Sequence, residues 1–101
     1  MEGFPNSEQY ARRVWLTQNL AEKGEMDPEV QEILKLWIVS EEVLRQEADE
    51  PNYLLTMELA RVFEEAGLSS NCDYYLGIAY EDAFQAGDEE TCEKIRGVYR
   101  L

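Results

Sequence analysis

Apolar residues recur at helical spacing along most of the chain, and the longest such segment runs from Asp27 to Glu47. Asp27 followed by Pro28 is a strong helix start, because the carboxylate caps free N–H groups and proline suits the first helical position. Plotted at about 100° per residue, the segment has two apolar stripes on roughly opposite sides. Neighbours are expected on both sides, so the pattern predicts that this is the central helix. The broad stripe contains Val30, Ile33, Leu34, Trp37, Ile38 and Leu44, and the second contains Leu36, Val39 and Val43.

Four more helices are predicted around this segment, and no useful stretch has the alternating pattern of a strand. Residues 1–6 are expected to be a loose leader, because Gly3 and Pro5 interrupt regular structure. The sequence therefore predicts an all-α, five-helix single domain of antiparallel hairpins over residues 1–101. The four further helices are expected at 7–23 (capped by Asn6 or Ser7), at 52–66, from Ser70 or Asn71 to Ala86, and after Asp88.

Each of these helices has a predicted inner face. On the first helix, Trp15 lies off that face and either packs against a neighbour or is an exposed contact residue. Arg12 and Arg13 are expected to be solvated. Small residues dominate the fourth helix's face, which predicts close approach of another helix. The inner face of the first helix is Tyr10, Val14, Thr17 and Ala21, widened by Leu16 and Leu20. That of the third helix is Leu55, Leu59, Val62, Phe63 and Ala66. The fourth helix has Cys72, Tyr75, Leu76, Ala79, Ala83 and Ala86, and the fifth has Cys92, Ile95 and Tyr99.

The charge of the chain excludes several kinds of partner. It has 22 acidic and 9 basic residues, a net charge of −13. Nucleic acids and anionic membrane surfaces are disfavoured, because both are bound by positive charge. The N-terminus has no basic and apolar signal-peptide pattern, and no apolar run approaches a membrane span, so a cytoplasmic location is expected. A basic protein is the expected partner.

Two cysteines are too few for a disulfide framework. Cys72 and Cys92 both fall on inner faces, which favours small buried thiols in a reducing compartment. A single bridge between neighbouring helices is the alternative.

The segment LGIAYEDAFQAGD, which starts at Leu76, resembles the first half of a tetratricopeptide repeat. Leu76, Gly77 and Tyr80 match the repeat's spacing, with Gly87 and Asp88 as its turn. The turn comes about three residues late, and Arg96 replaces an aromatic of the second helix. The resemblance covers about a third of the chain and implies a helical hairpin and a protein-binding role. It implies no catalytic residues.

The residues for most catalytic and metal-binding sites are missing. The chain has no histidine, which removes Ser-His and Cys-His nucleophiles and imidazole metal sites. Glu-x-x-Glu pairs occur at 22/25, 29/32 and 90/93, and such pairs can bind a hard cation, but solvated faces explain them in so acidic a chain. We therefore expect no enzyme activity, no catalytic residue, no cofactor and no metal.

The acidic residues are unevenly distributed. From Val62 to Glu93, both included, there are nine acidic residues and no Lys or Arg. The fourth helix combines an apolar pair with carboxylates on the side opposite its small residues, which is the layout of a protein contact with an anchor and a charged rim. Alternatively, the apolar pair covers the first or third helix. The candidate partner-binding residues are Tyr74, Ile78, Glu81, Asp82, Gln85, Asp88 and Glu89.

Two functions fit this sequence. The first is an acidic binding protein that occludes a basic, nucleic-acid-binding surface of another protein, as inhibitors, toxin immunity proteins and phage anti-defence proteins do. The second is a repeat-like adaptor that binds a peptide or helix, with which a homodimer is also compatible.

Overall fold

Five α-helices and no strand make up residues 5–99, the part of the chain that the computed structural model describes; side chains are described for residues 8–97. The all-α prediction is therefore confirmed. None of these helices is both long and apolar enough to cross a bilayer. The helices are α1 (Pro5–Lys23), α2 (Pro28–Glu47), α3 (Tyr53–Glu65), α4 (Ser69–Gln85) and α5 (Glu89–Tyr99).

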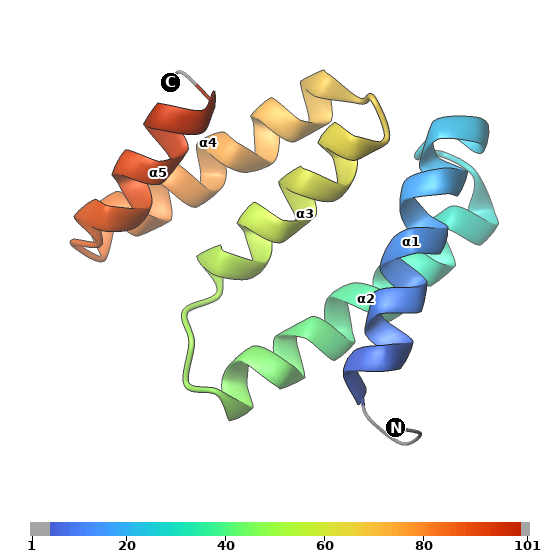
Figure 1. Cartoon of the computed structure of the whole chain (residues 1–101), viewed down its shortest axis with the longest axis horizontal. Helices are drawn as coiled ribbons and strands as arrows, with labels where there is room; N and C mark the ends of the chain where they lie inside the picture. Colours follow the sequence, from blue (N-terminus) through green and yellow to red (C-terminus); the bar gives the residue numbers. More distant parts are fainter. Residues whose placement is uncertain (1–4, 100–101) are drawn as a thin grey trace.

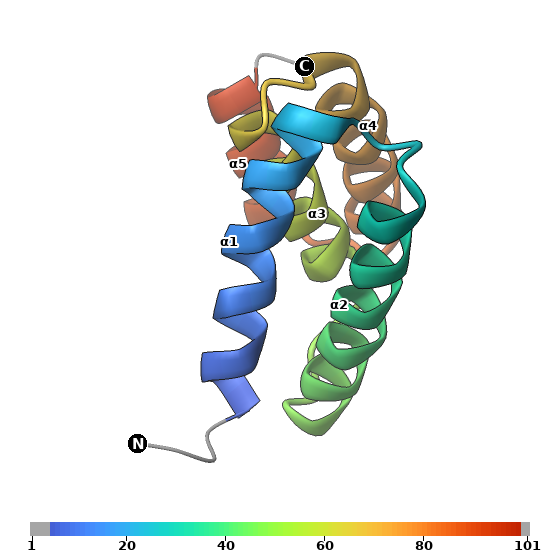
Figure 2. The same cartoon turned by 90° about the vertical axis from the view of Figure 1, so that its right-hand side faces the viewer.

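The helices form two thin layers. Consecutive helices run in opposite directions, and α3 lies between α4 and the α1–α2 hairpin (Figure 1). Turned by 90°, the molecule has α1 and α5 toward one side and α2 and α4 toward the other (Figure 2). The shortest dimension is 20 Å, which is two helix diameters. In so thin an arrangement the outer helices each keep an open face.

The helix at the centre of the fold is α3, which corrects the prediction that the Asp27–Glu47 segment is central. α3 contacts α1, α2 and α4, and its contact with α4 is the most extensive in the molecule. The predicted inner face of α3 is confirmed, and it is widened by Tyr53 and Ala60. Because apolar residues occupy so much of its circumference, this short helix can have three neighbours. Its buried residues are Tyr53, Leu55, Leu59, Ala60, Val62 and Phe63.

α2 buries only one of its two apolar stripes. Val30 and Trp37 are buried, and Ile33, Leu34 and Ile38 pack against the same core. The second stripe, Leu36, Val39 and Val43, is exposed. The expectation of neighbours on both sides is therefore wrong within the described chain, because α1 and α3 both lie toward the side of Trp37.

The predicted inner face of α1 is wrong in part, because the two leucines expected at its edge are the residues that are buried. Tyr10, Val14 and Ala21 are exposed, whereas Leu16 and Leu20 are fully buried. Leu16 and Leu20 are wholly apolar, whereas Tyr10 carries a hydroxyl that would need a hydrogen-bond partner if it were buried, so α1 is rotated to put the leucines inside. Trp15 is partly buried against the core, as the packing alternative proposed.

The remaining inner faces agree with the structure, apart from one residue. Cys72, Leu76, Ala79 and Ala83 are buried on α4, and Ala60 on α3 is also fully buried, so small residues bring these two helices together. Ala86, predicted to face inward, is exposed. On α5, Cys92 and Ile95 are buried, while the side chain of Tyr99 lies outside the described residues.

The helix ends follow two of the predicted caps. Asp27 Oδ1 accepts a hydrogen bond from the N–H of Val30 at 3.1 Å, and Asp88 caps α5 in the same way. α1 begins at Pro5, inside the expected leader, so neither Asn6 nor Ser7 is its cap. α4 begins after Leu68, and the Asn71 side chain instead bonds to Glu25 in the α1–α2 loop. This contact ties the hairpin to α4.

Both cysteines are free and buried, as predicted, and the alternative disulfide is not formed. Burial raises the pKa of the Cys72 thiol, with Glu64 adding to the effect. A thiol of raised pKa is a poor nucleophile at neutral pH. These side chains are part of the packed core.

Candidate functional site

Five of the candidate residues lie together on the outer side of α4, and we call them the acidic α4 face. Positions 74, 78, 81, 82 and 85 are separated by steps that keep them on one side of a helix. All five side chains are exposed, at 65% for Tyr74 and 38% for Ile78. These exposures do not support the alternative in which the apolar pair covers another helix. The face consists of Tyr74, Ile78, Glu81, Asp82 and Gln85.

The Tyr74 ring is held in place by a series of aromatic contacts. It meets the ring of Tyr75 edge-on, with centroids 5.2 Å apart. Tyr75 stacks on Phe63 of α3, with centroids 5.4 Å apart and planes 18° apart. Phe63 is in the core. Tyr74 is therefore an exposed aromatic residue on a rigid base.

The carboxylates of this face are not neutralised by cations of the same chain. Glu81 and Asp82 form no ion pair within residues 8–97, and the sequence places no Lys or Arg between Val62 and Glu93. Arg96 on α5 lies over the ring of Tyr80 instead, with its guanidinium carbon 5.8 Å from the ring centroid. The acidic α4 face thus combines an aromatic residue, an aliphatic residue and unpaired negative charge.

Asp88 has a structural role, unlike the neighbouring candidates. Its Oδ2 accepts hydrogen bonds from the Tyr53 hydroxyl at 2.6 Å and from Thr91 Oγ1 at 2.7 Å. Its Oδ1 accepts the N–H of Thr91 at 3.1 Å. The half-buried carboxylate therefore joins α3 to the start of α5 and is not free to bind a partner. Glu89, in the first turn of α5, is exposed.

These hydrogen bonds make stability depend on the ionisation of Asp88. The bond from Tyr53, followed by those from Thr91, lowers the Asp88 pKa below its ordinary 3.8, and the same contact raises the pKa of Tyr53 to about 12. A carboxylate with a lowered folded pKa stabilises the fold above its unfolded pKa and loses that effect as the pH falls through the folded value.

We expect Asp88→Asn to be less stable than wild type by a constant margin between pH 7 and pH 5. The margin should shrink below about pH 4, as Asp88 takes up its proton. Thermal unfolding at each pH measures it, and Glu89→Gln is the matched control, expected to show little margin at any pH. A margin for Asp88→Asn that stays constant down to pH 3 would contradict this role for the charge.

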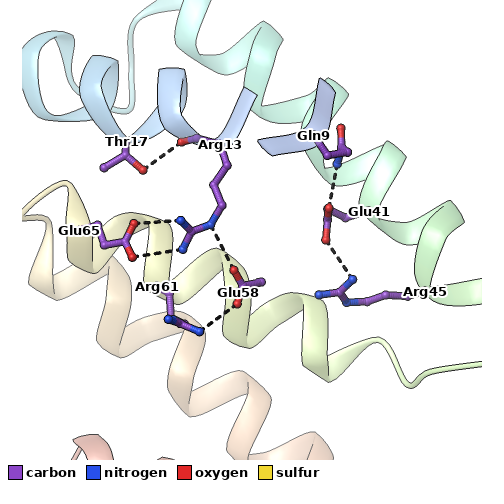
Figure 3. A network of polar contacts seen from close by, with 8 residues as sticks. All are labelled: Gln9, Arg13, Thr17, Glu41, Arg45, Glu58, Arg61 and Glu65. Carbon is purple, nitrogen blue, oxygen red and sulfur yellow. Dashed lines mark hydrogen bonds and ion pairs between the residues drawn. The ribbon is translucent and has the colours of Figure 1, made fainter. Parts of the chain in front are cut away.

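Arg13 has a structural role that its position in the sequence did not indicate. Its Nε lies 3.2 Å from Glu58, and its two terminal nitrogens contact the two oxygens of Glu65 at 3.1 and 3.3 Å (Figure 3). Arg61 also contacts Glu58, at 3.4 Å. Because both glutamates are on α3, this cluster joins α1 to the central helix, and the expectation of a solvated Arg13 is wrong.

A second polar group joins α1 to α2. The buried Gln9 donates a hydrogen bond to the Trp37 carbonyl at 3.1 Å. It also donates one to Glu41 at 2.9 Å, and Glu41 pairs with Arg45 (Figure 3). Arg12, also expected to be solvated, donates a hydrogen bond to Gln9 at 2.7 Å. Helix spacing alone shows which side of α1 these residues share, but not which partners they meet.

Metal-ligating groups and pockets are the other features of the described residues where a site could lie. Within residues 8–97 no three carboxylate or thiol side chains are grouped so that they could hold a metal ion. A pocket at the α4–α5 corner is lined by Tyr80, Phe84, Asp88, Glu89 and Arg96, among others. Of its two carboxylates, that of Asp88 is already hydrogen-bonded, because it caps α5.

No family model, curated protein or solved structure matches the chain. The resemblance to a tetratricopeptide repeat therefore stays a prediction. α4 and α5 do form a hairpin at the expected place, with Gly87 in its turn at a φ of 76°, a conformation that favours glycine.

Proposed function

We propose that this chain is a small acidic binding protein, and that its acidic α4 face covers a basic, nucleic-acid-binding surface of another protein. The observation that favours this role is the exposed Tyr74–Ile78 pair with unpaired carboxylates beside it on a single helix. The role is one of occlusion, without catalysis. It is the role of an inhibitor or an immunity-type protein.

In this proposal Tyr74 is the buried anchor of the interface and keeps the complex from dissociating quickly. Tyr74 loses little conformational freedom on binding, because Tyr75 and Phe63 already hold it from below. Rigid aromatic side chains that become fully buried are the commonest binding hot spots. Ile78, one turn further along α4, extends the same apolar contact.

In this proposal the carboxylates increase the rate of association with the partner and the selectivity for basic surfaces. Glu81 and Asp82 add to a net charge of −13, and a field of this sign accelerates encounter with a basic surface and disfavours acidic ones. Carboxylates on a rigid helix also occupy the positions that phosphates would take on a basic surface. A protein bound in this way would be unable to bind nucleic acid at the same time.

Site-specific photo-crosslinking in the native host tests the proposal. A photoreactive phenylalanine analogue replaces Tyr74 in one variant and the exposed Gln18 of α1 in a matched control. We expect position 74 to crosslink to a protein through a basic surface, and the purified complex to have lost nucleic-acid binding. Equal crosslinking from both positions, or capture through an acidic surface, would contradict the proposal.

A further inference from the structure

One side of α2 is an exposed apolar stripe, and its Val39 and Val43 also line an open groove together with Glu8 and Arg12 of α1. Leu36, Val39 and Val43 are 48%, 58% and 48% exposed, and their spacing of three and four residues places them along one line of the helix. They lie opposite the buried Trp37. We call these three residues the α2 stripe.

One pair of charges beside the α2 stripe favours self-association. Lys35 and Glu42 are seven residues apart, so they lie on the same flank of the stripe, two turns from each other. A two-fold rotation centred near Val39 places Leu36 opposite Val43 of a second copy. The same rotation places Lys35 on the same side of the contact as Glu42 of that copy, because in an antiparallel pair like flanks meet. The two residues are offset by two positions along the helices, about 3 Å, which their long side chains can span.

We propose that the α2 stripe is the contact surface of a homodimer, in which two copies of α2 pack antiparallel about Val39. Lys35 is exposed and forms no ion pair within residues 8–97, and this arrangement gives it a partner in each copy. A basic helix from another protein would instead bring cations against Lys35. The proposal is independent of the function proposed for α4.

The total charge makes this dimer weak and dependent on salt. Each copy carries −13, and Glu32 of one copy faces Glu47 of the other at the ends of the stripe. Added salt screens this repulsion, so it should strengthen the dimer, whereas it weakens binding of a basic partner. Three apolar residues per copy fall short of the ~800 Å² per partner of a standard interface, so we expect dissociation constants of roughly 10–100 µM.

Sedimentation equilibrium of the full chain tests the proposal, from about 5 µM to about 500 µM so that the range brackets the expected constant. Wild type should change from monomer to dimer, and more readily at high salt. Val43→Glu should raise the dissociation constant at least ~100-fold, because it buries an acid in each half of the contact. The control Val14→Glu makes the same change on the far side of α1 and should leave the dimer intact. If Val43→Glu fails to fold, Val39→Ser replaces it.

A charge exchange tests the orientation. Lys35→Glu should weaken the dimer about tenfold by placing like charges opposite each other, and adding Glu42→Lys should restore it. Circular dichroism verifies that each variant is folded. A wild-type chain that is monomeric throughout, equal effects of Val43→Glu and Val14→Glu, or no restoration by the double exchange would overturn the proposal. Self-association that weakens with salt would also overturn it, because attraction between opposite charges, and not the apolar stripe, would then hold the two copies together.

Discussion

Replacing Trp37 by alanine is expected to destabilise the protein by about 3–5 kcal/mol, as for other large buried aromatic residues. The indole is 1% exposed, and the α2 backbone at this residue accepts a hydrogen bond from the buried Gln9 of α1. Truncation would therefore open a cavity where α1 and α2 meet. Urea unfolding followed by far-UV circular dichroism measures the change.

Tyr10→Ala is the matched control for Trp37→Ala. The sequence pattern placed Tyr10 inside, but its side chain is 68% exposed, so we expect its truncation to change the free energy of unfolding by less than about 0.5 kcal/mol. If Tyr10→Ala is the more damaging of the two, the orientation of α1 described above is wrong.

Phe63→Ala is expected to cost a similar ~3–5 kcal/mol, because it removes a buried aromatic from the helix with the most neighbours. Phe63 is 1% exposed, lies on α3, and stacks on Tyr75 of α4. Its loss would weaken the largest helix contact in the molecule and also the base on which Tyr74 rests. Urea unfolding measures the first effect, and near-UV circular dichroism of the tyrosines reports the second.

Phe84→Ala provides a control of identical chemistry. Its ring is 69% exposed and stacks only loosely on Tyr80, with centroids 6.4 Å apart. We expect a cost below about 1 kcal/mol. Similar costs for the two phenylalanines would contradict the assignment of α3 as the central helix.

The sequence was sufficient for the number and order of the helices, for the inner face of α3, and for that of α4 except Ala86. Leu55, Leu59 and Phe63 mark the most strongly apolar side of α3, and the apolar residues elsewhere on this helix, such as Leu54 and Met57, pack against the same core. On α4 the row of alanines correctly predicted close approach. Asp27 and Asp88 were predictable as caps because capping depends on local geometry.

Periodicity failed where a helix carries two plausible apolar sides. α1 offers Tyr10 and Val14 on one side and Leu16 and Leu20 on another, and α2 offers both Trp37 and the α2 stripe. The choice depends on where the other helices pack, which no single segment encodes. The role of Arg13 was hidden for the same reason, since its partners Glu58 and Glu65 are on α3, far along the chain. The exposure of Tyr74 and Ile78 was an open alternative until α3 was placed on the opposite side of α4.

The association rate of the crosslinked partner, measured as a function of salt, tests the role of the acidic α4 face most directly. Glu81→Lys/Asp82→Lys is compared with Glu22→Lys/Glu50→Lys, a control that makes the same change in net charge at exposed positions on α1 and in the α2–α3 loop. We expect the α4 variant to associate at least ~10-fold more slowly at low salt and to lose most of its salt dependence, because rim charges act mainly on encounter. The control should stay close to wild type. If both variants slow association equally, the net charge of the chain attracts the partner and the acidic α4 face is not the binding site.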